Sequence, residues 1–322
     1  MSVSQRPDRE IDLSIVTTAR NEAGNVVEFL DRSREAIEAL GVDGEILFFD
    51  DASSDGTLRA ARDYAASHPE LPISIVRNPF QKGIVSAVVR GSSMARGRAV
   101  LFLPSDLESL PDEDIPKLYA AFDDETDVVV GWRQGRDDNK LVASSIYQRI
   151  MAIMFGVRVN DGNWIKLVRR DKLDDLLLLS DWHSVFIGLL SARGCRIREV
   201  PTQWHRRKYG TSKFGGRRFL HAITAALSCR AYLTFGERPL LLFLELFALF
   251  AVAALLFAVL AFLLPGGNVV LMLFSFTSLI LGALAMTAGL TVEALRWGRS
   301  QNQIRLQDLA ERAEDDSMNE GA

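Results

Sequence analysis

Three pairs of acidic or amide side chains stand where apolar runs of this sequence end. Oxygen atoms of these types can accept hydrogen bonds from a nucleobase and from ribose hydroxyls, and carboxylates also bind hard divalent cations. Helix capping is the alternative role for such residues. The pairs are Asn21 and Glu22, Asp50 and Asp51, and Asp106 and Glu108.

Asp106 and Glu108 are two residues apart in a predicted loop, so both carboxylates can turn toward one cation. Mg²⁺ or Mn²⁺ held by one or two carboxylates together with substrate phosphates fits this spacing. Such an ion would stabilise a departing diphosphate as a Lewis acid. A loop with two solvated acids is the other interpretation that the spacing allows.

Basic residues in predicted loops can complement these acids by binding phosphate oxygens. The segment Arg207–Lys213 (RKYGTSK) combines cations, a glycine and hydroxyl groups, and it predicts an anion-binding loop beside a membrane. The same cluster can anchor the chain to anionic lipid headgroups, at ~1 kcal/mol per charge, and both roles stay open. Further candidates for phosphate binding are Lys82, Arg133 and Lys140.

The elements that must position these residues alternate between strand and helix patterns. Apolar, β-branched runs predict strands at 11–18, 45–50, 73–77, 99–103, 127–130, 164–168 and 196–201. Helical patterns cover about 25–40, 83–95, 142–155 and 183–193, and a further helix is expected to begin after residue 57. This alternation predicts an α/β domain with a mostly parallel sheet and right-handed crossovers, whose carboxyl edge carries the polar pairs.

Two apolar stretches near the C-terminus, 240–264 and 269–292, are each long enough to cross a ~30 Å hydrocarbon core. The short loop between them predicts a transmembrane hairpin. Basic residues flank the hairpin at its outer ends and its loop carries no charge, so the positive-inside rule places the catalytic domain and both termini in the cytoplasm.

Composition and charge divide the chain into five parts. The net charge of −4 gives no reason to expect nucleic acid as a partner, and two cysteines imply no disulfide framework. The acidic tail is expected to be solvated and partly disordered. The predicted parts are an N-terminal tail (1–10), a catalytic domain (11–215), a juxtamembrane amphipathic helix (216–238), the hairpin (239–293) and the acidic tail (294–322).

The order of motifs resembles that of family-2 glycosyltransferases of GT-A fold, and within them the polyprenyl-phosphate glycosyltransferases similar to dolichol-phosphate mannosyltransferase. The resemblance covers residues 11 to about 215 and implies a Rossmann-like catalytic domain followed by an interfacial helix and a transmembrane hairpin. The segments that carry it are IVTTARNE (15–22), EILFFDDASSDGT (45–57), Lys82-Gly83, FLPSDLESLP (102–111) and RKYGTSK (207–213).

The resemblance implies a role for each candidate residue. Asp106 and Arg207 would be catalytic, Asp106 and Glu108 would hold the divalent cation, and Asp51 would be the likelier base contact of its pair. One departure is Pro104, which stands where the family has the first aspartate of its D-x-D motif. The nucleotide-sugar site would comprise Asn21, Glu22, Asp50, Asp51, Lys82 and Ser105. The acceptor-phosphate site would comprise Arg133, Lys140, Ser144, Arg207, Ser212 and Lys213.

The expected reaction is inverting transfer of a sugar from GDP-mannose or a UDP-hexose to a polyprenyl phosphate, with undecaprenyl or dolichyl phosphate as the natural acceptors. Expected partners are therefore the nucleotide sugar, the lipid phosphate, membrane lipids and, through the hairpin, further copies of the chain. Two alternatives remain open. One is a glycosyltransferase that extends a lipid-linked glycan, and the other is a catalytically inactive, membrane-tethered protein that binds nucleotide sugars.

Overall fold

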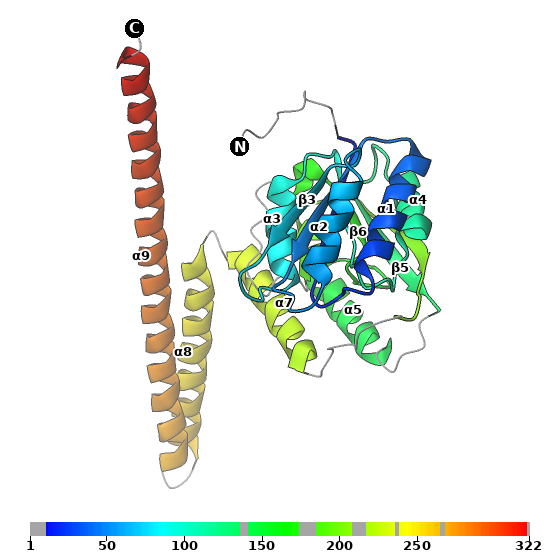
Figure 1. The fold of residues 1–322 in the computed structure, drawn as a ribbon. Helices are drawn as coiled ribbons and strands as arrows, with labels where there is room; N and C mark the ends of the chain where they lie inside the picture. The colour runs from blue at the N-terminus through cyan, green and yellow to red at the C-terminus, as the bar shows by residue number, and fades with distance from the viewer. Residues whose placement is uncertain are drawn as a thin grey trace. The chain divides into compact units, whose positions relative to one another are not determined.

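The computed structural model describes residues 11–135, 141–173, 185–207, 217–235, 238–264 and 268–320 of the chain. These residues form two compact units, one ending at Arg230 and the other beginning at Ala231 (Figure 1). The first unit contains the β-sheet and all the acidic and basic candidates that the structure describes. The second contains the long apolar helices.

A seven-stranded sheet forms the centre of the first unit, in the order β3-β2-β1-β4-β6-β5-β7. β6 runs antiparallel to its neighbours β4 and β5, and the other neighbouring strands are parallel. The predicted α/β fold with a mostly parallel sheet is therefore confirmed. The strands are β1 (Leu13–Ala19), β2 (Gly44–Asp50), β3 (Ile73–Arg77), β4 (Ala99–Phe102), β5 (Val128–Gln134), β6 (Lys166–Arg169) and β7 (Ile197–Gln203).

Helices cover both faces of the sheet because side chains alternate along each strand. Ile15 of β1 is fully buried in one core cluster with Phe29 of α1. Its neighbour Val16 faces the opposite side, where a Cβ on Gly91 of α3 would meet it at 2.4 Å. The helices of this unit are α1 (Val26–Leu40), α2 (Thr57–Ser67), α3 (Ile84–Met94), α4 (Pro111–Ala120), α5 (Leu141–Phe155) and α6 (Phe186–Ala192), and α7 (Arg217–Phe235) begins in it.

Helix α4 was not predicted, although its first turn carries clear signals. Pro111 occupies the start of the helix, where its missing N–H costs no hydrogen bond. Asp112, Glu113 and Asp114 follow, and their charges are favourable near the positive end of the helix dipole. A second proline, Pro116, weakens the helical pattern of this short segment.

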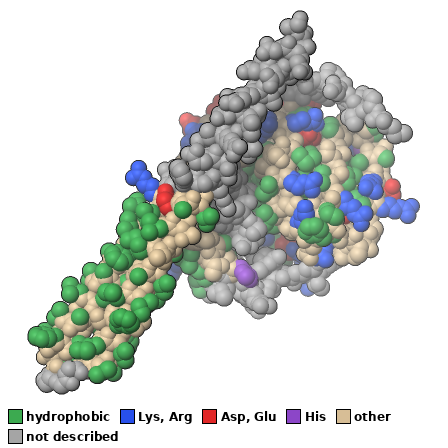
Figure 2. Space-filling view, turned by 90° about the vertical axis from the view of Figure 1, so that its left-hand side faces the viewer, with side chains coloured by type: hydrophobic (Ala, Val, Ile, Leu, Met, Phe, Trp, Pro, Cys, Tyr) green, Lys and Arg blue, Asp and Glu red, His purple; other side chains and the backbone are tan. Residues whose placement is uncertain are grey.

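The second unit is a pair of helices, α8 (Pro239–Leu263) and α9 (Val269–Glu320). The segments Pro239–Leu263 and Val269–Leu295 are long and apolar enough to cross a membrane. Small residues let the helices approach closely, because a Cβ on Gly289 would meet Phe243 at 2.5 Å. Hydrophobic side chains cover the outside of the pair, as a membrane-spanning hairpin requires (Figure 2).

Helix α9 continues as one helix through the acidic tail to Glu320. The physical reason is local composition. Residues 301–320 contain neither proline nor glycine and are rich in Gln, Leu, Ala, Glu and Arg, all of which have favourable helix propensity.

Candidate active site at the carboxyl edge of the sheet

The candidate residues gather where the strand order reverses, between β1 and β4. The connections after β1 and β2 move the chain toward β3, whereas the connection after β3 returns it to β4 on the other side of β1. Loops at the carboxyl ends of such strands form the ligand-binding crevice of open α/β sheets. All three predicted polar pairs lie at this edge: Asp50 ends β2 and Asp51 follows it, and the other two pairs lie in the loops after β1 and β4.

Asn21 and Glu22, which follow β1, form hydrogen bonds with the loop after β2. Asn21 adopts a left-handed backbone conformation (φ 57°), which asparagine tolerates better than most residues. Its side-chain oxygen accepts a hydrogen bond from the amide of Ser54 at 2.9 Å. The amide of Glu22 donates to the Thr57 hydroxyl at 2.8 Å, and its carboxylate accepts a bond from Asn25 at 2.6 Å. These contacts hold the first two loops together.

Asp50 and Asp51 differ sharply in their surroundings. The Asp51 carboxylate accepts hydrogen bonds from the amides of Lys82 and Gly83, at 2.7 and 3.0 Å, and from the Asn78 side chain at 3.1 Å. Asp50 is fully buried, and neither of its carboxylate oxygens has a hydrogen-bond partner within the described residues. Its only ion pair there is with exposed Arg77, at 3.9 Å.

A buried carboxylate with unused acceptors is costly, so a ligand that donates to Asp50 would remove that cost. Asp51 instead folds the segment that leads into α3. Lys82 lies in this segment, and its ammonium sits over the Phe80 ring at 5.2 Å from the centroid. Phe80 is 63% exposed, so the face of an aromatic ring is accessible in this segment.

The loop after β4 presents the second acidic pair. Ser105 is buried and donates its hydroxyl proton to the carbonyl of Thr18, at 3.1 Å, which ties β4 to β1. Leu107 has a left-handed backbone conformation (φ 57°), which is uncommon for a non-glycine residue and turns the chain sharply. The backbone amide of Glu108 donates to the Asp106 carboxylate at 3.2 Å, which holds that side chain over the turn.

Two arginines bind this acidic pair. The Arg207 guanidinium contacts the carboxylate of Asp106 and, through Nε, Glu108 Oε1 at 2.7 Å. Arg133 Nη1 lies 3.5 Å from the other Glu108 oxygen, and Arg133 Nε donates to Asp161 at 2.8 Å. The result is a continuous network of alternating charges along the edge of the sheet.

The network changes the acid–base properties of its members. Burial raises the pKa of Asp106, against the opposing charge of Arg207. Burial opposes the charge on Arg207, but Asp106 and Glu108 outweigh it and raise the pKa of that guanidinium. The two groups therefore respond in different ways: their mutual attraction favours the charged guanidinium of Arg207, whereas for Asp106 burial outweighs the same attraction.

The same pair is suited to holding a divalent cation. Asp106 and Glu108 already converge on one positive group, so their oxygens are close enough together to share an ion. No cluster of three or more metal-ligating side chains occurs in the part of the chain that the structure describes. A divalent ion there would take its remaining ligands from substrate phosphates and water, as Mg²⁺ commonly does.

The acceptor-phosphate candidates are only partly described. Arg133 and Arg207, which come from two distant segments, both contact Glu108 and lie in one network. Ser144 belongs to α5, but its side chain lies outside the described residues. Lys140, Ser212 and Lys213 also lie outside the described residues.

Sequence reasoning missed two residues that the fold brings to this edge, Asp161 and Lys166. Asp161 is buried and binds Arg133 through both carboxylate oxygens. Lys166 is 2% exposed and begins strand β6. One signal was present in the sequence, because Lys166 interrupts an otherwise apolar strand pattern.

Comparison with known proteins places this geometry in context. Residues 14–177 match the family model described as glycosyl transferase family 2. The undecaprenyl-phosphate 4-deoxy-4-formamido-L-arabinose transferase of Klebsiella pneumoniae is 30% identical over 301 residues, covering 91% of this chain and 90% of that protein. The dodecaprenyl-phosphate galacturonate synthase of Rhizobium johnstonii is 28% identical over 240 residues, covering 72% of this chain and 70% of that protein.

Solved structures share the fold at lower sequence identity. Glucosyl-3-phosphoglycerate synthase from Mycobacterium tuberculosis, in complex with phosphoglyceric acid, superposes with a TM-score of 0.53 at 20% identity. That match covers 68% of this chain and 79% of the other. A further structure of that enzyme contains Mn²⁺, UDP-glucose and phosphoglyceric acid, with a TM-score of 0.53, 17% identity, and coverage of 68% and 80%.

Proposed function

This chain belongs to glycosyl transferase family 2 and is a glycosyltransferase of GT-A fold, and from that premise we propose that it transfers a sugar from a nucleotide-diphospho-sugar to a polyprenyl phosphate. Both curated relatives carry a polyprenyl phosphate in their names, but they differ in the sugar. The donor proposed here is GDP-mannose or a UDP-hexose.

One observation carries the proposal: Arg207 contacts both Asp106 and Glu108, and Arg133 extends the same network at the carboxyl edge of the sheet. Arginine binds phosphate in a bidentate manner, and the acidic pair suits a cation that binds a diphosphate. The site therefore offers partners for the leaving group and for a phosphate acceptor side by side. Two apolar helices follow in the chain and would keep a lipid acceptor within reach.

The reaction requires little acid–base chemistry from the protein. A phosphate monoester has a second pKa near ~6, so its oxygen is already an anionic nucleophile at neutral pH. That oxygen would attack the anomeric carbon, the bond from this carbon to the diphosphate oxygen would break, and the nucleoside diphosphate would leave with the bonding electrons. A single displacement of this kind inverts the anomeric configuration.

The protein would act by positioning both substrates and by stabilising charge. Asp50, with its two unused acceptors, would bind the nucleoside, together with Glu22 and the segment organised by Asp51. Arg207 and Arg133 would bind phosphate oxygens, exchanging part of their present ion pairs for substrate contacts. Asn21, Lys82 and Ser105 would shape the donor site.

Asp106 and Glu108 would hold the divalent cation, Mg²⁺ or Mn²⁺, which would neutralise charge that develops on the leaving diphosphate. Pro104 removes one carboxylate that the family motif supplies, so fewer protein ligands would hold the ion. We therefore expect cation binding to depend strongly on the presence of the nucleotide.

The proposed setting is the cytoplasmic face of a membrane, with both termini in the cytoplasm and the hairpin in the bilayer. The apolar length of α8 and of the first part of α9 supports a membrane location. The basic residues at the outer ends of the hairpin support the cytoplasmic orientation. Association of the hairpin with other copies of the chain is part of the same proposal.

A transfer assay on the full chain in detergent tests the function. It contains a polyprenyl phosphate, Mg²⁺ or Mn²⁺, and a panel of labelled nucleotide sugars. Label that moves into the organic phase from one donor would support the proposal and identify the sugar. Asp106→Asn should abolish this transfer, whereas Asp63→Asn, a matched change on the exposed surface of α2, should leave it unchanged. Nucleotide binding without transfer to any lipid would contradict the proposal.

A further inference from the structure

Lys166 is a buried cation that the proposed mechanism does not use. It is the first residue of β6, and it pairs in the sheet with Phe102 of β4 and Val130 of β5. This register places it at the carboxyl edge of the sheet, beside the charged network. Its side chain is 2% exposed, which is rare for lysine unless a carboxylate neutralises it.

No such carboxylate touches Lys166 within the part of the chain that the structure describes. Its recorded partner there is an aromatic ring, because the ammonium lies 4.9 Å from the centroid of Trp164. Asp161 is the nearby acid, but both of its carboxylate oxygens bind Arg133. Lys166 is therefore attracted by Asp161 and repelled by Arg133, without a direct ion pair to Asp161.

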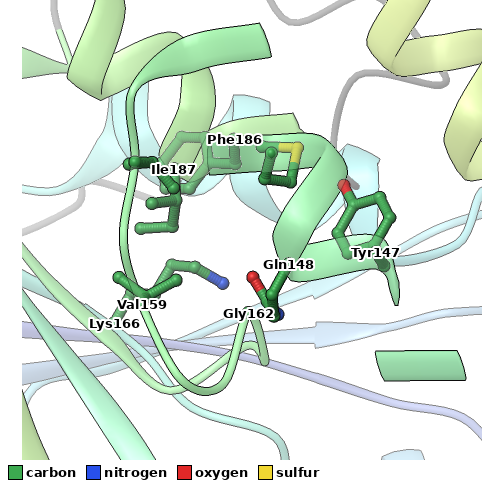
Figure 3. A pocket seen from close by; sticks show the side chains of 9 residues that line it. Tyr147, Gln148, Val159, Gly162, Lys166, Phe186 and Ile187 are labelled. Atoms are coloured by element: carbon green, nitrogen blue, oxygen red, sulfur yellow. The ribbon is translucent and has the colours of Figure 1, made fainter. Parts of the chain in front are cut away.

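The side chain of Lys166 points into a cavity (Figure 3). Tyr147 and Gln148 of α5 supply polar groups to one wall, whereas Phe186 and Ile187 of α6 form an apolar wall. Gly162 lies close to Gln148, since a Cβ at this position would meet the amide nitrogen of that side chain at 2.8 Å. The cavity combines one cation, polar donors and apolar surface, but its volume of about 10 Å³ is room for about one water molecule, so an anionic group could enter it only after lining side chains such as Gln148 move.

We propose that Lys166 is the cation of an oxyanion-binding subsite in this cavity, which receives a phosphate or carboxylate group of a substrate. The inference rests on the proposed function and adds a residue and a ligand class to it. The oxyanion has two possible sources, namely the phosphate of the lipid acceptor and the carboxylate of an acidic donor sugar.

A buried lysine without an ion pair costs stability, and such a group beside a cavity is a candidate for binding a ligand. An anion that enters the cavity would supply the missing charge partner, while Tyr147 or Gln148 could donate a hydrogen bond to it. Burial also lowers the pKa of Lys166 to about 7, which is the expected result when the partner is absent.

A purely structural role makes a different prediction. If Lys166 served only packing, replacement by methionine, which has a similar length, would disturb the fold and weaken every ligand alike. If it serves the subsite, the same replacement should leave the melting temperature unchanged or higher, because a buried charge without an ion pair is removed.

The test is equilibrium binding to the full chain in detergent, measured by titration calorimetry. Farnesyl phosphate probes the acceptor phosphate, and UDP-glucuronate with its uncharged counterpart UDP-glucose probes the donor sugar. The proteins are wild type, Lys166→Met, Lys166→Arg as the charge-retaining variant, and Lys117→Met as a matched control on the exposed surface of α4.

We expect Lys166→Met to weaken binding of farnesyl phosphate or of UDP-glucuronate at least about tenfold, with UDP-glucose nearly unaffected and Lys166→Arg retaining part of the affinity. Whichever anionic probe responds identifies the source of the oxyanion. Wild-type affinity of Lys166→Met for both anionic probes would overturn the inference, and so would an equal loss for all three probes with a lower melting temperature.

These outcomes are independent of turnover. Failure of the wild-type chain to transfer sugar to any lipid phosphate would contradict the proposed function, whereas the binding measurements decide the role of Lys166 on their own.

Discussion

Arg207 and Glu108 are 99 residues apart in the sequence, and in the folded chain Nε of the arginine lies 2.7 Å from the glutamate carboxylate. The same guanidinium contacts Asp106, so the segment after β7 closes over the loop after β4. The side chains of Arg207 and Glu108 are mostly buried, with exposed fractions of 23% and 21%. This contact joins the residues expected to hold the cation to those expected to bind the acceptor.

The first prediction concerns the two-point contact of Arg207. Arg207→Lys keeps the charge but cannot reach Asp106 and Glu108 together with the planar geometry of a guanidinium. We expect the transfer rate to fall at least about tenfold, because the group that positions phosphate is lost. Arg198→Lys, at an exposed ion pair with Asp123, is the matched control. Equal rates for all three proteins in a steady-state assay would exclude this role.

The second prediction separates the two neighbouring aspartates. Asp51→Asn should lower the free energy of unfolding by about 1–3 kcal/mol, because the hydrogen bonds to the amides of Lys82 and Gly83 depend on the carboxylate. Asp50→Asn should not destabilise the protein but should weaken nucleotide binding at least about tenfold, because its two acceptors are unused in the chain itself. Thermal unfolding and nucleotide titration of both variants check this. Loss of stability in Asp50→Asn with unchanged nucleotide affinity would show that the assignment is reversed.

The third prediction is that the positive charge of Arg207 competes with a divalent cation for Asp106 and Glu108. Arg207→Met leaves Asp106 and Glu108 without their strongest positive partner, so Mn²⁺ should bind about tenfold more tightly in the absence of nucleotide. Electron paramagnetic resonance of free Mn²⁺ measures this affinity directly. In the double variant Arg207→Met with Asp106→Asn the gain should disappear. Unchanged Mn²⁺ affinity in Arg207→Met would place the cation elsewhere.

The fourth prediction follows from the lowered pKa of Lys166, which is about 7 in the folded chain and 10.5 for an ordinary lysine. Between these values the unfolded chain binds more protons than the folded one. The free energy of unfolding should therefore rise with pH across this window, by at most about 1.4 kcal/mol per pH unit.

Lys166→Met removes this contribution, so its stability advantage over the wild type should shrink as the pH rises from about 7 to about 9. Thermal unfolding of both proteins in detergent over this range measures the difference. A constant difference at every pH would mean that Lys166 is charged in the folded chain throughout.

Much of the fold could be predicted because the buried strands correspond to apolar runs in the sequence. The run 73–77 became β3 with the same bounds, and 99–103 became β4 within one residue. The order of the strands and the antiparallel direction of β6 could not be read in this way, because pairing depends on contacts between distant segments. Helix α4 was missed because acidic residues and two prolines obscure its apolar periodicity.

The candidate site was predictable as residue types but not as contacts. Asp106, Glu108 and Arg207 were identified from their motifs, yet nothing in the sequence indicated that the arginine would bind both acids. Asp161 and Lys166 were not predicted at all. Asp161 lies a few residues before the short strand β6 and Lys166 begins that strand, and the role of each depends on neighbours from distant segments.

The most direct test of the central claim is to identify both products of a single reaction mixture that contains the full chain, a polyprenyl phosphate and the active donor. We expect a nucleoside diphosphate and a lipid that contains one phosphorus per sugar, formed in equal amounts, with the anomeric configuration inverted. Release of a nucleoside monophosphate together with a diphosphate-linked lipid, or nucleoside diphosphate without any glycolipid, would contradict it.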